Sequence, residues 1–266
     1  MTAPAAFPGG TAVSRLSVYT TASVDGHRGG TPHLHTASTE GYIVLAGTGA
    51  LQTISADGFA ERPLTPGTVL WFTPGTVHRL INHANLELLV VMANAGLPEA
   101  GDAVMTFPDD VLADAARYHR AATLPSGAAA APDDLPGAGV SQREAAAHTR
   151  RDLGVTGFLA LRAAVEAGES SALTRLHERA ARLVAPHGPA WRATWEASVA
   201  AEARATDAAL TALAAGRGPH LAAAAATDGP ARPGPAVFGM CGRLTTYDLT
   251  PPHPTLPVDP EEHPND

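Results

Sequence analysis

Hydrophobic and polar positions alternate in short runs over residues 12–94, and Gly or Pro separates one run from the next. Such runs predict strands, because successive side chains of a strand point to opposite faces. The expected strands span residues 13–21, 42–46, 51–55, 69–72, 77–81 and 86–92. Tight turns are expected at residues 47–49 and 56–58, where Gly can adopt positive φ. Short strands at close, regular spacing favour a β-sandwich or a small barrel.

A helical pattern follows the strands. A short helix is expected over residues 109–121, and a longer helical region begins at Ser141, which has a Glu three residues later and so the spacing of a capping box. Leu176, Ala180 and Leu183 then fall on one helical face. The sequence therefore changes from strands to helices at about its midpoint.

Two stretches lack a clear periodicity. Residues 122–140 are rich in Ala, Pro and Gly, and residues 227–266 are rich in Pro, with residues 237–248 as their one stretch expected to be ordered. We therefore divide the chain into a β-barrel domain at residues 12–121, a linker at 122–140, a helical region at 141–226 and a Pro-rich C-terminal segment at 227–266, and expect proteolysis to cut first in the linker.

Composition excludes several kinds of chemistry. The chain has 266 residues, of which 45% are hydrophobic, so it can bury a core. All 18 basic residues are Arg, and without Lys neither a Schiff base nor a Walker-type phosphate loop can form. A single cysteine, Cys241, excludes a disulfide framework and a multi-cysteine metal site. The 12 His residues leave imidazole and carboxylate groups as the available metal ligands.

Charge and hydropathy bear on partners and location. The net charge of -8 argues against broad binding to nucleic acid or to anionic membranes. The N-terminus lacks the pattern of a signal peptide, and no apolar run reaches the length of a membrane span. We therefore expect a cytoplasmic protein that binds neither nucleic acid nor a membrane, and a homodimer is left open.

One group of residues has the pattern of a metal site. His33 and His35 are two positions apart, so on a strand both imidazoles face the same side. Glu40 follows five residues later, and His78 lies in another run typical of a strand. Three imidazoles and one carboxylate suit Fe(II), Mn(II), Ni(II), Cu(II) or Zn(II), and they fit Ca(II) or Mg(II) poorly.

The spacing of these residues resembles the first sequence motif of the cupins. That motif has a His-x-His pair, then three or four intervening residues and a Glu, then six intervening residues and a Gly. His33, His35, Glu40 and Gly47 match it, whereas the leading Gly of the motif falls on His27.

The second cupin motif is matched as well. Gly67, Gly75, His78 and Asn82 have its spacing, whereas Thr73 occupies the position of its Pro, with a Pro one residue later. Both departures affect turns and neither touches a metal ligand.

The resemblance covers about residues 12–95 and implies a mainly β fold. This fold is a double-stranded β-helix, a jelly-roll-like barrel, which a small α-helical region without a recognised family follows. The resemblance also implies one divalent transition-metal ion per chain, held by His33, His35, Glu40 and His78. We favour Fe(II), with Mn, Ni, Cu or Zn as alternatives.

A substrate pocket is expected beside the metal. Strand parity places Tyr42 and Val44 on the face of Glu40, and Leu80 on the face of His78. An ordinary core position explains Tyr42 equally well. One of Trp71 and Phe72 should face the cavity. This lining favours a neutral, partly apolar small-molecule substrate.

The family resemblance leaves the reaction open, because cupins include several kinds of enzyme. We favour a quercetinase-like dioxygenase, in which Glu40 also acts as a general base. A metal-dependent isomerase or lyase is the second enzyme hypothesis. A protein that senses or binds a ligand without catalysis is the third hypothesis.

Overall fold

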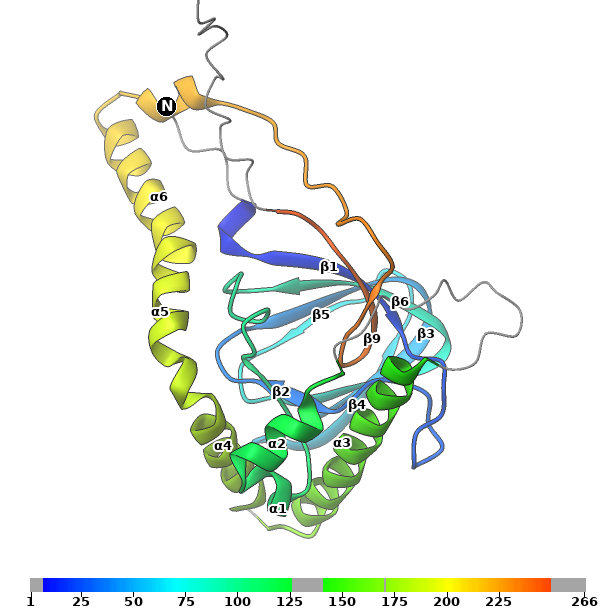
Figure 1. Cartoon of the computed structure of the whole chain (residues 1–266). Helices are drawn as coiled ribbons and strands as arrows, with labels where there is room; N and C mark the ends of the chain where they lie inside the picture. The colour runs from blue at the N-terminus through cyan, green and yellow to red at the C-terminus, as the bar shows by residue number, and fades with distance from the viewer. Residues whose placement is uncertain (1–6, 126–140, 170, 250–266) are drawn as a thin grey trace, which may run out of the picture.

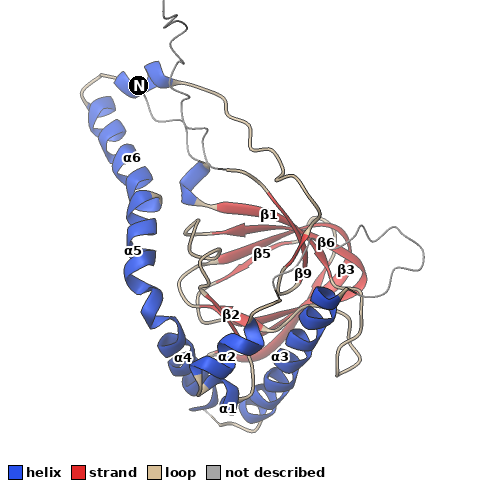
Figure 2. Cartoon of the chain, viewed as in Figure 1, coloured by secondary structure: helices blue, strands red, loops and turns tan. Residues whose placement is uncertain are grey.

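The structure is a computed structural model that describes residues 7–125, 141–169 and 171–249. A β-barrel forms its centre, and helices lie along its outside (Figures 1 and 2). All strands of the described residues belong to one antiparallel sheet. These strands are β1 (Ala12–Val18), β2 (His33–His35), β3 (Glu40–Ser55), β4 (Gly58–Leu64), β5 (Val69–Phe72), β6 (Val77–Met92), β7 (Ala103–Met105), β8 (Val237–Phe238) and β9 (Gly242–Thr246).

Two long strands organise the barrel. β3 and β6 pair with each other along most of their length, β5 adds to the first part of β3, and β1 adds to the last part of β6. This arrangement confirms the expected double-stranded β-helix. The turn expected at residues 56–58 connects β3 to β4.

The turn expected at residues 47–49 is wrong, because β3 continues through it with shifts of register against β6. Gly47 has φ +73°, and a Cβ added there would lie 2.1 Å from the carbonyl oxygen of Asn85. Asn85 on the facing strand also has positive φ, at 44°. Left-handed residues on both strands make a bulge, which bends the pair without ending it. The strands expected at 77–81 and 86–92 are likewise one continuous strand, β6, which passes through the same bulge.

The α-helices of the described residues begin after β7. They are α1 (Asp109–Leu112), α2 (Ala115–Ala122), α3 (Gln142–Glu166), α4 (Ser171–Val184), α5 (Gly188–Ala197) and α6 (Val199–Ala214), with 3₁₀ turns η1 (Pro8–Gly10), η2 (Ala185–His187) and η3 (Pro219–Ala223). The helix expected at 109–121 is interrupted, because Asp114 accepts hydrogen bonds from the N–H groups of Ala116 and Arg117 and so begins a second helix. Ser141 caps α3 as expected.

The barrel and the helices share a hydrophobic core. Leu34, Ile54 and Val77 of the barrel belong to the same buried cluster as Phe158 of α3 and Leu176 of α4. The close approach of α3 depends on a Gly at position 157, where a Cβ would lie 2.1 Å from a backbone oxygen of the loop after β7. The helices α3 and α4 are therefore packed onto the barrel wall.

The C-terminal segment adds a strand to the barrel. The stretch expected to be ordered at 237–248 contains β8 and β9, and β9 pairs with β1 so that Leu244 faces Leu16. Most of the linker expected at 122–140, and the end of the Pro-rich segment from residue 250, lie outside the described residues. Among the described helices, none combines the length and apolar character that crossing a membrane requires.

Candidate metal centre

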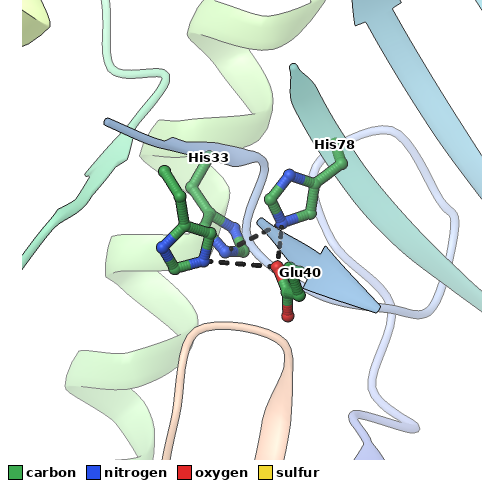
Figure 3. A group of neighbouring side chains, drawn as sticks. His33, Glu40 and His78 are labelled. Carbon is green, nitrogen blue, oxygen red and sulfur yellow. Dashed lines mark hydrogen bonds and ion pairs between the residues drawn. The ribbon is translucent and has the colours of Figure 1, made fainter. Parts of the chain in front are cut away.

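Four side chains from three strands converge inside the barrel. His33 of β2 and His78 of β6 are paired residues on neighbouring strands, and Glu40 begins β3. Figure 3 shows the side chains of His33, His78 and Glu40 pointing toward one another. One ligand atom from each of these residues and His35 lies within 4.8 Å of the others. The four side chains are all buried. The sequence therefore correctly predicted that these four residues lie together.

The histidines all turn the same nitrogen inward. Nδ1 of His33 lies 2.8 Å from the carbonyl oxygen of Thr31, and Nδ1 of His78 lies 3.1 Å from that of Thr76. A carbonyl oxygen only accepts, so each Nδ1 must carry the proton and donate it. Each Nε2 then presents an unprotonated lone pair to the interior. This arrangement of outer hydrogen bonds is typical of metal-binding histidines.

A carboxylate orients the third histidine. Oδ1 of Asp102 lies 2.6 Å from Nδ1 of His35, and its Oδ2 accepts a hydrogen bond from the backbone N–H of Ser38 at 3.0 Å. Asp102 has no exposed surface. Sequence analysis missed this residue, because it lies 67 positions from His35 and no local pattern connects the two. The one available signal was general: a metal-binding His needs an acceptor for its other ring nitrogen.

The contacts among the inward-facing atoms fit a cation. Nε2 of His78 lies 3.0 Å from Nε2 of His33. Oε2 of Glu40 lies 3.1 and 3.2 Å from Nε2 of His78 and His35, yet it accepts no hydrogen bond from the described residues. Lone pairs that face one another at these distances repel, and a metal ion would accept them all. The four residues therefore form a group suited to a divalent metal ion.

The electrostatics of the site also favour positive charge. Burial opposes a charge on His35, but the adjacent carboxylates of Asp102 and Glu40 outweigh it and raise the pKa of His35 to about 10, and a metal ion at Nε2 would displace the proton there. Burial likewise opposes a charge on Glu40, but attraction to the imidazoles of His78 and His35 keeps the pKa of Glu40 well below its ordinary value. Burial and the neighbouring imidazoles lower the pKa of His33. Glu40 is thus an anion, and His33 is a neutral imidazole.

The residues expected to line a pocket lie in the core. Tyr42, Val44 and Leu80 are buried in the cluster that fills the barrel, and none of them is among the described residues lining the main cavity. Their role in binding substrate stays a prediction. Phe72 is the buried member of its pair and packs against the ring of Tyr42, whereas Trp71 is 72% exposed.

A cavity of about 760 Å³ reaches the four-residue group. His33, His35 and Glu40 line its inner end, together with side chains from β1, β6 and β9. A site of this size accommodates a small organic molecule. A ligand in this cavity can therefore reach the atoms that are suited to hold a metal.

The part of the chain that builds the site matches a known family model. Residues 21–92 match the family model described as "Cupin domain", and this stretch contains all four residues of the group. The chain therefore contains a cupin domain in its N-terminal third, as the two sequence motifs predicted. No curated protein matches the chain at a significant level.

Several solved structures are similar to this part of the chain. Pac13 from Streptomyces, described as a nucleoside dehydratase, is 18% identical with a TM-score of 0.25, and the match covers 33% of this chain and 62% of that one. The chain thus spans less than two thirds of Pac13. A Klebsiella pneumoniae protein with a double-stranded β-helix domain is 15% identical, with coverages of 34% and 76% and a TM-score of 0.27. A predicted oxalate decarboxylase from Thermotoga maritima is 22% identical, with coverages of 31% and 64% and a TM-score of 0.24.

Proposed function

We propose that this protein is a metal-dependent enzyme that acts on a small organic molecule, and that its reaction is an oxygenation. The observation that carries the proposal is the convergence of three Nε2 atoms and Oε2 of Glu40 at the inner end of a cavity of about 760 Å³. Three nitrogen ligands and one carboxylate leave up to two positions open on a six-coordinate ion. Fe(II) is the ion we favour for this ligand set.

His33, His35, His78 and Glu40 would hold the ion, which when bound supplies Lewis acidity and a change of redox state. Glu40 contributes the one negative charge among these four groups and so offsets part of the charge of the cation. Its carboxylate also lies at the cavity, where it could accept the proton of a substrate hydroxyl. Apolar side chains, among them Leu16, Val90 and Met92, line the same cavity.

The proposal is tested by measuring oxygen uptake with the Fe(II)-loaded protein and a panel of neutral phenolic and enolic compounds, flavonols included. We expect uptake that depends on both the metal and the compound. Conversion of a compound without oxygen uptake would contradict the oxygenase and favour an isomerase or lyase. Tight binding with no conversion would favour a ligand-binding protein.

Glu40→Gln sharpens this test, because it keeps the shape of the side chain but removes its charge and its ability to accept a proton. At saturating metal we expect turnover to fall about 100-fold or more, the usual contribution of a general base. Glu196→Gln, at an exposed position of α5, is the matched control and should turn over like the wild type. Wild-type turnover by metal-saturated Glu40→Gln would show that Glu40 is a structural ligand only.

A further inference from the structure

The cavity that reaches the four-residue group extends beyond the barrel. Its lining includes the buried residues His33, His35 and Glu40, and also the apolar side chains Leu16, Val90, Met92 and Leu244. Its outer end is lined by residues from the helical region and the C-terminal segment, namely Ala197, Ser198, Glu202 and Arg232. In Figure 1, α5 and α6 run along one side of the barrel, beside η1 and the start of β1. Parts of the chain outside the matched cupin residues 21–92 thus complete the cavity.

The C-terminal wall of the cavity is held in place by hydrogen bonds. The carbonyl oxygen of Gly239 accepts bonds from the hydroxyl of Tyr19 and from Nη2 of Arg150, both at 2.9 Å. The carbonyl oxygen of the next residue, Met240, accepts the N–H of Thr31 at 2.9 Å. Contacts from the residue that follows β1, from α3 and from the loop before β2 therefore fix this wall, which should keep its shape when a ligand enters.

The wall is also apolar. Met240 and Cys241 both line the cavity. Burial raises the pKa of the Cys241 thiol, so that the group stays neutral and behaves as a small apolar side chain. Apart from the histidines of the four-residue group, Arg232 is the one basic residue among the described residues that line the cavity. A phosphorylated ligand would need more positive charge than this cavity provides.

The helical wall packs closely against the barrel. A Cβ added at Gly10 would lie 2.8 Å from Cγ2 of Val199, and one added at Gly96 would lie 2.5 Å from Cγ2 of Thr194. Both distances are shorter than real Cβ contacts, so a larger residue at either position would force a side chain of α5 or α6 to shift. The α5–α6 region therefore contacts the segments beside the cavity at two places, through Thr194 of α5 and Val199 of α6.

We infer that the junction of α5 and α6, together with the C-terminal segment, forms the outer half of the substrate site. The substrate is then an elongated, mainly apolar molecule. An oxygen donor at one end faces His33, His35 and Glu40, and the other end reaches Ser198 and Glu202. The contact of the oxygen donor with His33, His35 and Glu40 rests on the proposed function. The binding of an elongated apolar molecule along the cavity does not rest on it. The volume of about 760 Å³ is within the range of sites for drug-sized ligands.

Alkyl hydroxamates of increasing chain length test this inference, because the hydroxamate oxygens bind a metal and the chain reports on the cavity. The protein is loaded with Ni(II), and binding is measured by calorimetry from acetohydroxamate to octanohydroxamate. We expect each added methylene to tighten binding about fourfold, the equivalent of about 0.8 kcal/mol. Equal affinity across the series would overturn the inference while leaving the metal site intact.

Ala197→Trp tests the helical wall directly. Ala197 lines the outer cavity at an exposed position, so the larger side chain can narrow the cavity without disturbing the core. We expect octanohydroxamate to bind at least tenfold more weakly and acetohydroxamate to bind as in the wild type. Ala203→Trp, exposed on α6 and away from the cavity lining, should change neither affinity. Unchanged octanohydroxamate binding in Ala197→Trp would also overturn the inference.

A metal-independent probe separates the two proposals. If the protein bound no metal, the proposed function would fail, and the cavity would then be tested with N-phenyl-1-naphthylamine, a neutral apolar fluorophore. We expect the fluorophore to bind the wild type and Ala203→Trp, and Ala197→Trp to weaken that binding at least tenfold. Absence of binding, or equal binding to all three proteins, would contradict the elongated apolar site.

Discussion

The barrel and the helical region differ in the side chains that they bury. The barrel buries β-branched and aromatic side chains on closely paired strands. Its four candidate metal ligands, His33, His35, Glu40 and His78, are also buried. The helical region is rich in Ala, and α6 leaves Leu210 and Leu213 at 61% and 49% exposure. Among the described residues of this region, those of α3 and α4 belong to a buried cluster shared with the barrel. The barrel thus places the chemical groups, and the helices support its wall and extend its cavity.

The largest effect is expected at the shared core. Phe158 of α3 is fully buried against barrel residues, and Phe158→Ala should lower the free energy of unfolding by about 3–5 kcal/mol. Leu159→Ala is the control on the same helix, because Leu159 is 38% exposed and should cost less than about 1 kcal/mol.

This comparison is made by chemical unfolding, followed both by helical circular dichroism and by release of bound metal. Because the core is shared, Phe158→Ala should shift the two transitions together. A shift of the helical signal alone, with metal release unchanged, would show that barrel and helices unfold independently.

A smaller effect is expected at Asp102, which acts inside the barrel. Asp102→Asn removes the charge that orients His35, and loss of such an outer partner lowers metal affinity about 10–100-fold. Titration with Zn(II) against a competing chelator measures this change. Asp207→Asn, exposed on α6, should bind as the wild type does. Equal affinity in Asp102→Asn would mean that the strands alone orient His35.

The smallest effect is expected where α6 packs against η1. Gly9 and Gly10 have almost the same positive φ, 67° and 64°, but only a Cβ at Gly10 would touch Val199. Both Ala variants share the backbone strain, so their difference isolates the contact with α6. We expect Gly10→Ala to be less stable than Gly9→Ala by about 1 kcal/mol in thermal unfolding. Equal stability would indicate that α6 moves aside at little cost.

The residues that could be predicted from the sequence are those fixed by local geometry. His33 and His35 share a strand face because strands have a period of two, and family spacing added Glu40 and His78. The bulge at residues 47–49 could not be predicted, since Gly suits both a turn and a bulge. The conformation of Asn85 on the facing strand decides between them.

Features that depend on contacts between distant parts of the chain could not be predicted from the sequence either. The contact of Asp102 with His35 and the pairing of β9 with β1 join segments that are far apart. The outer cavity around Ser198 depends on how α5 and α6 pack. Strand and helix periodicity describe which face is apolar, and they carry no information about which element covers that face.

The most direct test of the central claim is metal analysis of the protein purified without chelators or a metal-affinity tag. We expect about one divalent transition-metal ion per chain in the wild type and in His83→Ala, which alters an exposed histidine of β6. His35→Ala and His78→Ala should stay folded and lose that ion, because each removes one of four converging ligands. Full metal occupancy in both ligand variants would contradict the assignment of the site.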